Sequence, residues 1–93
     1  MKALTVYYVP TCADSAAVVS YLFLRGADAR LVNLEQHPDS TEAVKRAAGG
    51  QVRTPMLEVD GAWHAEPTLA ELKQFLDRWG LPAEAAPHEQ KAP

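Results

Sequence analysis

Cys12 is the only cysteine of this 93-residue chain and the residue best suited to covalent chemistry. It lies in Val9-Pro10-Thr11-Cys12-Ala13-Asp14-Ser15, between an apolar run and the start of a helical pattern. A cysteine in the first turn of a helix faces unpaired N–H groups and the positive end of the helix dipole, which favour the nucleophilic thiolate. A free cysteine can instead be a small buried hydrophobe. Because strand-to-helix turns are exposed, we predict a reactive thiol.

Ser15 occupies the position of the second cysteine in a Cys-x-x-Cys dithiol. A serine cannot resolve a mixed disulfide, so any redox cycle must take its second thiol from solution or from a partner protein. Two roles stay open for the Ser15 hydroxyl: a hydrogen bond to the Cys12 thiolate, or capping of helix N–H groups. Asp14 adds negative charge but also suits the helix dipole, which leaves the sign of its effect on the Cys12 pKa open.

The length and composition fit one small domain, with 47% hydrophobic residues. We assign residues 1–80 to this domain and residues 81–93, rich in Ala, Pro and Glu, to a flexible C-terminal tail. A single cysteine rules out an intramolecular disulfide and favours a reducing compartment. The N-terminal apolar run is too short for a secretory signal or a membrane span. We therefore expect a cytoplasmic protein with no membrane partner.

The charge pattern argues against nucleic acid. The net charge is −3, and the one adjacent basic pair, Lys45-Arg46, suits the end of a predicted helix. We expect no nucleic-acid partner. His37, His64 and His88 share no metal-ligand spacing with one another or with Cys12, so we predict no metal site.

The first half of the chain reads as strand, helix, strand. β-branched and aromatic residues predict a buried strand over 3–9 that stops at Pro10. The following helix ends at Gly26 and is followed by a strand over 29–34. We predict these residues on its buried face: Ala16, Val19, Leu22 and Phe23.

The second half begins with a helix and continues with a hairpin. Asp39, three residues before Glu42, predicts a capped helix that ends at Gly49-Gly50. Strands over 56–59 and 62–64 flank Asp60-Gly61, a two-residue hairpin signal.

The last helix has two candidate starts. Pro67 suits a first helical turn, whereas Thr68 and Glu71 match a capping box that makes Thr68 the cap. Gly80 ends the helix. We predict these residues on its apolar stripe: Leu69, Leu72, Phe75, Leu76 and Trp79. The α/β order strand-helix-strand-helix-strand-strand-helix predicts a four-stranded mixed sheet flanked by helices, with a parallel first pair of strands and an antiparallel hairpin.

With this order, the chain resembles the glutaredoxin family of the thioredoxin-like fold, and more narrowly the mycoredoxin branch. The family's lead-in to C-x-x-C or C-x-x-S is matched by Tyr7, Pro10, Cys12 and Ser15, and its cis-proline signature by Thr54-Pro55. The spacing of these motifs carries the resemblance over about residues 2 to 79. The segments most similar to mycoredoxins are 49–55, 60–61 and 67–72.

The resemblance implies a cis Thr54-Pro55 bond that turns the backbone of Thr54 toward Cys12, so that it can pair with a substrate segment; a trans edge proline is the alternative. Val9 stands where glutathione-dependent members have a lysine, and Glu66-Pro67-Thr68 where they have a Gly-Gly-Asp turn. The resemblance therefore implies a small thiol other than glutathione. We expect five residues to bind substrate: Pro10, Thr11, Arg53, Thr54 and Pro55. Arg53 is a candidate partner for a substrate carboxylate, or simply a solvated loop residue.

By this resemblance we expect a monomeric monothiol oxidoreductase that reduces mixed disulfides between a small thiol and proteins. Cys12 is the nucleophile, Ser15 tunes it, and an external low-molecular-weight thiol is the co-substrate. Its partners are then disulfide-containing proteins, and no bound cofactor is needed. Two alternatives stay open: a [2Fe–2S] carrier that uses Cys12 from two chains, and a redox-inactive adaptor that holds a partner peptide.

Overall fold

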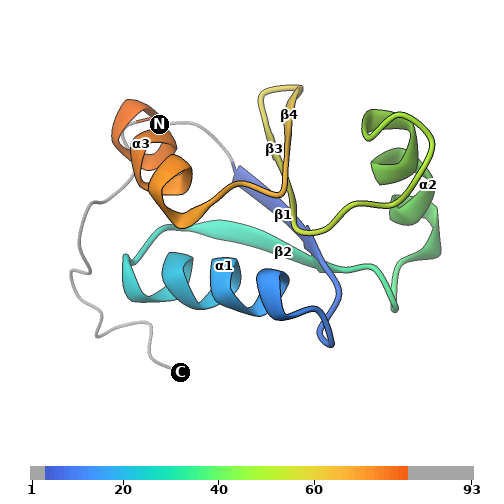
Figure 1. The fold of residues 1–93 in the computed structure, drawn as a ribbon, viewed down its shortest axis with the longest axis horizontal. Helices are drawn as coiled ribbons and strands as arrows, with labels where there is room; N and C mark the ends of the chain where they lie inside the picture. The colour runs from blue at the N-terminus through green and yellow to red at the C-terminus, as the bar shows by residue number, and fades with distance from the viewer. Residues whose placement is uncertain (1–3, 80–93) are drawn as a thin grey trace.

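A computed structural model describes residues 4–79 of the chain (Figure 1). The predicted tail and His88 lie outside these residues. None of the helices within 4–79 is long and apolar enough to cross a membrane. The seven elements are β1 (Leu4–Tyr8), α1 (Ala13–Leu24), β2 (Ala29–Asn33), α2 (Pro38–Ala47), β3 (Met56–Val59), β4 (Ala62–Ala65) and α3 (Leu69–Trp79).

The strands form one four-stranded sheet in the order β2-β1-β3-β4. β1 pairs in parallel with β2, with Leu4 opposite Ala29 and Tyr8 opposite Asn33. β1 pairs antiparallel with β3, and β3 antiparallel with β4. The predicted element order and mixed sheet are confirmed. Because the β1–β2 pair is parallel, the carboxyl ends of both strands lie at the same edge of the sheet, and α1 starts from that edge.

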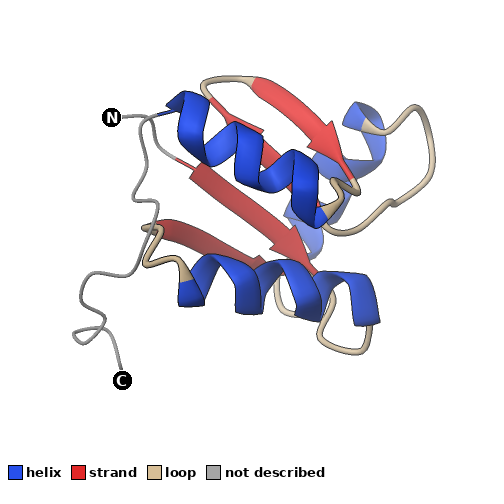
Figure 2. Ribbon diagram, turned by 60° about the vertical axis from the view of Figure 1, so that its left-hand side comes forward, coloured by secondary structure: helices blue, strands red, loops and turns tan. Residues whose placement is uncertain are grey.

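The sheet divides the core into two layers, which Figure 2 shows with α1 and α3 in front of the strands and α2 on the other side. Alternate residues of each strand face opposite layers. The α1/α3 layer contains Leu4, Val6, Val18, Leu22, Leu57, Val59, Leu72 and Leu76. The α2 layer contains Val32, Leu34, Val44 and Met56. The cysteine-bearing end of α1 is therefore anchored on a buried layer.

The predicted buried face of α1 is wrong in part. The helix buries Ser15, Val18 and Leu22, whereas Ala16 is exposed and Phe23 is 54% exposed. Apolar residues lie nearly all round this helix, so apolar spacing does not fix the face that meets the sheet. The face of α1 that packs on the sheet includes a buried polar residue, Ser15, together with Val18 and Leu22.

The predicted cap of α2 is also wrong. The helix begins at Pro38, His37 is the N-cap residue without a side-chain capping bond, and Asp39 lies within the first turn. Proline is favoured at the first helical position because its fixed φ suits the helix and it lacks an N–H to satisfy. Asp39 there still complements the helix dipole.

At α3 the capping box is confirmed. The N–H of Thr68 donates to Glu71 Oε1 at 2.9 Å, and the N–H of Glu71 donates to Thr68 Oγ1 at 3.0 Å. Pro67 therefore precedes the cap. Along the predicted stripe, Leu72 and Leu76 are fully buried, and Leu69 at the start is 46% exposed. The capping box fixes where α3 begins, and hence where Pro67 and Glu66 lie relative to Cys12.

The hairpin between β3 and β4 turns at Asp60 and Gly61, both with positive φ (52° and 85°), as a two-residue turn requires. The N–H of Gly61 donates to Glu58 Oε2 at 2.9 Å. This turn is at the far end of the hairpin from Met56, so the start of β3, next to Pro55, faces the cysteine edge of the sheet.

Candidate active site

Cys12 is the N-cap residue of α1, with extended backbone angles. Its N–H donates to the carbonyl oxygen of Val9 and its carbonyl accepts the N–H of Ala16, both at 3.0 Å. The side chain is partly exposed. The thiol thus lies at the positive end of the helix dipole and within reach of a substrate.

Ser15 is fully buried beneath the thiol. Its hydroxyl oxygen accepts the N–H of Val9 at 3.4 Å. Its backbone N–H and its hydroxyl are the two largest causes that lower the pKa of Cys12 below its ordinary value. These effects on the Cys12 pKa favour a tuning role for Ser15, and Ser15 lies inside α1 rather than at its N-cap position, which Cys12 occupies.

Thr54 and Pro55 are far from Cys12 in the sequence but lie next to it in the structure. Their peptide bond is cis, as the resemblance implied, and the trans alternative is wrong. The Cys12 S–H donates to the carbonyl oxygen of Thr54, with 3.8 Å between sulfur and oxygen. The Thr54 side chain lowers the pKa of Cys12, and so does the N–H of Asp14, while desolvation acts in the opposite direction. The balance favours the thiolate.

The remaining predicted site residues lie around this centre. Pro10 and Thr11 are exposed in the turn just before Cys12. Arg53 forms a two-pronged ion pair with Glu66, from its Nε to Oε2 at 3.3 Å and from its Nη2 to Oε1 at 3.4 Å. About half of each of these two side chains is exposed. Arg53, predicted to meet a substrate carboxylate, already holds a carboxylate of its own chain.

Glu66 was missed by sequence reasoning. It has a positive φ of 49°, and its N–H donates to the carbonyl oxygen of Pro55 at 2.8 Å. This bond joins the residue after β4 to the cis-proline segment, and the Glu66 side chain forms the ion pair with Arg53. The unusual backbone angle of a residue before Pro67 gave no signal in the sequence.

A small cavity, the cysteine-side cavity, lies beside this centre, with a volume of about 200 Å³. It is bounded by the first turns of α1, by Pro55 and by the segment that leads into α3. Its lining residues are Asp14, Ala17, Val18, Pro55, Glu66, Pro67, Thr68 and Leu69. Asp14 and Pro55 therefore connect this cavity with the two segments that meet at Cys12.

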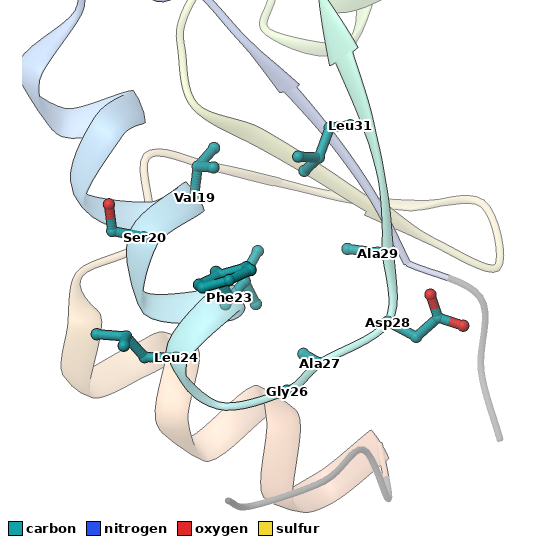
Figure 3. A pocket seen from close by; sticks show the side chains of 10 residues that line it. Val19, Ser20, Phe23, Leu24, Gly26, Ala27, Asp28, Ala29 and Leu31 are labelled. Carbon is teal, nitrogen blue, oxygen red and sulfur yellow. The ribbon is translucent and has the colours of Figure 1, made fainter. Parts of the chain in front are cut away.

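A larger cavity of about 830 Å³, the apolar cavity, lies at the other end of α1. Figure 3 shows Phe23 pointing into the space between α1 and β2, with Leu31 reaching toward it from the edge strand. Asp28 at its rim lies just before Ala29, which pairs with Leu4 at the start of β1. The apolar cavity is thus at the opposite end of the sheet from Cys12.

No group of three or more potential metal ligands occurs within residues 4–79. The His64 ring packs on the rings of Phe75 and Trp79, with centroids 4.7 and 5.8 Å apart. His37 is the N-cap residue of α2. His64 is thus part of an aromatic cluster, whereas His37 is exposed and its side chain makes no capping bond.

A partly exposed thiol at a helix N-terminus, facing a cis-proline beside a four-stranded mixed sheet, defines a thioredoxin-like thiol protein. The glutaredoxin family model matches residues 4–64, and the chain belongs to this family. The family suggests thiol–disulfide oxidoreductase activity.

Among solved structures, the chain is similar to a Nu-class GST from Haemonchus contortus, with 22% identity and a TM-score of 0.56. The match covers 86% of this chain but only 37% of that chain, and it shows a shared fold. No curated protein matches the chain.

Proposed function

We propose that this protein is a monothiol oxidoreductase that reduces mixed disulfides between a small thiol and proteins. The Cys12 thiolate attacks the small-thiol sulfur, and a bond forms between these two sulfurs. The disulfide bond to the protein sulfur breaks, and that sulfur leaves as a thiolate that takes a proton from water. An external thiolate then attacks the small-thiol sulfur on Cys12, which releases a small-thiol disulfide and regenerates the Cys12 thiolate.

The observation that carries this proposal is the convergence of Ser15 and Thr54 on Cys12, which lowers the pKa of the thiol. A thiol with a lowered pKa has a larger fraction of thiolate at a given pH and is a better leaving group in the second step. Because Cys12 is the only cysteine, the second thiol must come from outside the chain.

We propose that the protein substrate docks across the cis-proline segment. The carbonyl of Thr54 lies 3.8 Å from Cys12 Sγ, so backbone pairing at Thr54 would place an extended segment beside the thiol. The exposed residues Pro10 and Thr11 would flank it on the other side. Pro55 itself is buried, so its side chain would support this segment from below.

We further propose a mycoredoxin-like small-thiol specificity in a reducing compartment such as the cytoplasm. Val9 replaces the lysine of glutathione-dependent members, and Arg53 is paired with Glu66. Neither residue offers a free cation for the carboxylates of glutathione. The single cysteine, which cannot protect itself within an internal disulfide, suits a reducing compartment.

The proposal is tested with a peptide whose cysteine is capped by 2-mercaptoethanol, a small neutral thiol. The chain should release the peptide thiol with a mass increase on Cys12 of one cap, and Cys12→Ser should release none. Turnover by Cys12→Ser would overturn the proposal. The [2Fe–2S] alternative instead predicts a coloured dimer after reconstitution with iron and sulfide, and a colourless product counts against it.

A further inference from the structure

The cysteine-side cavity has an excess of negative charge. Of its lining side chains, Asp14 on α1 and Glu66 before α3 are charged, and both are carboxylates. The cation next to them, Arg53, is bound to Glu66 through two nitrogen–oxygen contacts of 3.3 and 3.4 Å. Two carboxylates against one guanidinium leave one excess negative charge at this cavity, which is lined by Asp14 in the first turn of α1 and by Pro55 of the cis-proline segment.

The start of α3 does not reverse this sign. A helix N-terminus ordinarily favours an anion through its unpaired N–H groups and dipole. Here Thr68 lines the cavity, and its N–H is bonded to the carboxylate of Glu71 at 2.9 Å. The Glu71 carboxylate thus offsets part of the positive charge at the start of α3.

Glu66 is held in place by backbone contacts as well as by its ion pair. Its N–H donates to the carbonyl of Pro55 at 2.8 Å, and Pro55 also lines the cavity. Asp14 is fixed in the first turn of α1, two residues after Cys12. Both carboxylates are therefore built into the same framework that positions the thiol.

We infer that Cys12 selects mixed disulfides whose small thiol carries an amine, and that Asp14 and Glu66 determine this specificity. The inference rests on the proposed function. In the first step, a disulfide bond forms between Cys12 and the small-thiol sulfur while the peptide leaves as its thiol. The small-thiol portion is the part that stays on the enzyme, so its ammonium group lies by the cysteine-side cavity during the transfer.

The test uses one peptide capped with three two-carbon thiols that differ in charge: cysteamine (+1), 2-mercaptoethanol (0) and thioglycolate (−1). For each capped peptide, we measure the single-turnover rate constant with which the protein releases the peptide thiol. We divide it by the rate constant with which free N-acetylcysteine amide releases the same peptide, which removes intrinsic differences in reactivity between the caps. We expect cysteamine to be fastest and thioglycolate slowest, with about a threefold to fivefold step per charge for a half-exposed site. The preference should shrink in 0.5 M salt, where charges are screened over about 4 to 5 Å.

Variants then assign the effect to the two carboxylates. Asp14→Asn and Glu66→Gln should each flatten the order, and the double variant, which leaves Arg53 as the local charge, should favour thioglycolate. Asp28→Asn is the control, because it removes the same charge. Asp28 lies just before β2, at the opposite end of the sheet from Cys12. This variant should keep the cysteamine preference.

The neutral cap separates this inference from the proposed function. If Cys12 does not react with the 2-mercaptoethanol cap, the proposed function is wrong and the inference falls with it. If the neutral cap reacts but thioglycolate is as fast as cysteamine, the inference alone is overturned. The same holds if Asp28→Asn changes the order as much as Asp14→Asn or Glu66→Gln does.

Discussion

The two ends of α1 carry two very different hollows. The C-terminal end borders the apolar cavity of about 830 Å³, lined by residues such as Phe23 and Leu31. The N-terminal end borders the cysteine-side cavity of about 200 Å³, lined by two carboxylates and the cis-proline. The smaller cavity lies at the end of α1 that carries Cys12, where the backbone N–H groups of the helix start favour a thiolate. The larger cavity is therefore not the one at the cysteine end of the helix.

The two ends of α1 also differ in how far apart in the sequence their neighbouring residues are. The apolar cavity is formed by one continuous stretch, from Val19 to Leu31. The centre around Cys12 needs Thr54, which is 42 residues away, and the Arg53–Glu66 pair. Substitutions at the two ends should therefore have different consequences.

The largest expected difference is in thiol transfer. Cys12→Ser should reduce transfer to the uncatalysed level, because a serine hydroxyl stays protonated and forms no disulfide. At the other end, Leu24→Gln, at a side chain that is 70% exposed, should change the rate by less than about twofold. Release of thiol from a peptide capped with 2-mercaptoethanol measures both variants. A strong loss in Leu24→Gln would mean that the apolar end takes part in the chemistry.

The next effect is on stability. Leu72→Ala removes a fully buried side chain of α3 that packs in the same layer as α1, and we expect a loss of about 2 to 5 kcal/mol. Leu31→Ala, on the edge strand at the apolar cavity, should lose less than about 1 kcal/mol, since this side chain is 47% exposed. Urea unfolding of both variants gives the comparison. Equal losses would mean that the apolar cavity is as tightly packed as the core.

Much of this fold could be predicted from the sequence. The element order, the Asp60-Gly61 hairpin and the Thr68 capping box rest on local residue types, and each is confirmed. Local signals were ambiguous where two rules competed, as at Pro38 and Asp39 before α2. They failed on the buried face of α1, where nearly every position is apolar or small.

The site was predictable only in part for the same reason. Cys12 and Ser15 are marked by their position at the start of a helix, whereas the cis bond of Thr54-Pro55 was implied only by the resemblance to the glutaredoxin family. Glu66 has no such mark: its position depends on a positive φ and on a hydrogen bond to Pro55. Contacts between distant segments are set by packing, which periodicity does not encode.

A smaller effect is expected at Ser15. Ser15→Ala removes the hydroxyl that lowers the pKa of Cys12, so this pKa should rise toward the ordinary value. The pH profile of iodoacetamide alkylation should then shift to higher pH. The backbone N–H of Ser15 remains, so part of the lowering should persist. The variant should also lose about 1 to 3 kcal/mol, because the N–H of Val9 loses its acceptor. An unchanged profile would assign the tuning of the thiol to the helix terminus alone.

The same pKa predicts how stability depends on pH. A thiol with a lowered pKa in the folded state is ionised there over a pH range in which the unfolded chain still holds its proton. The resulting stabilisation is full above the unfolded pKa and is lost as the pH falls through the folded pKa. The stability of the natural chain relative to Cys12→Ser should therefore rise with pH toward the alkaline side. A flat difference would contradict the lowered pKa.

The smallest effect is expected from the ion pair at the C-terminal end of α1, where Arg25 Nη2 lies 3.5 Å from Asp77 Oδ1. Asp77 also pairs with Lys73 Nζ at 3.3 Å. Asp77→Asn should still cost less than about 1 kcal/mol, because the carboxylate is half exposed and the guanidinium keeps its place over the Tyr21 ring at 5.2 Å. Glu66→Gln breaks an ion pair at the other end whose arginine is more exposed than Arg25, so it should cost no more stability, again measured by urea unfolding. Only the second substitution should change which capped peptide Cys12 prefers. If both substitutions left that preference unchanged, the two ends of α1 would be electrostatically equivalent for catalysis, and the charge of the cysteine-side cavity would have no part in choosing the small thiol.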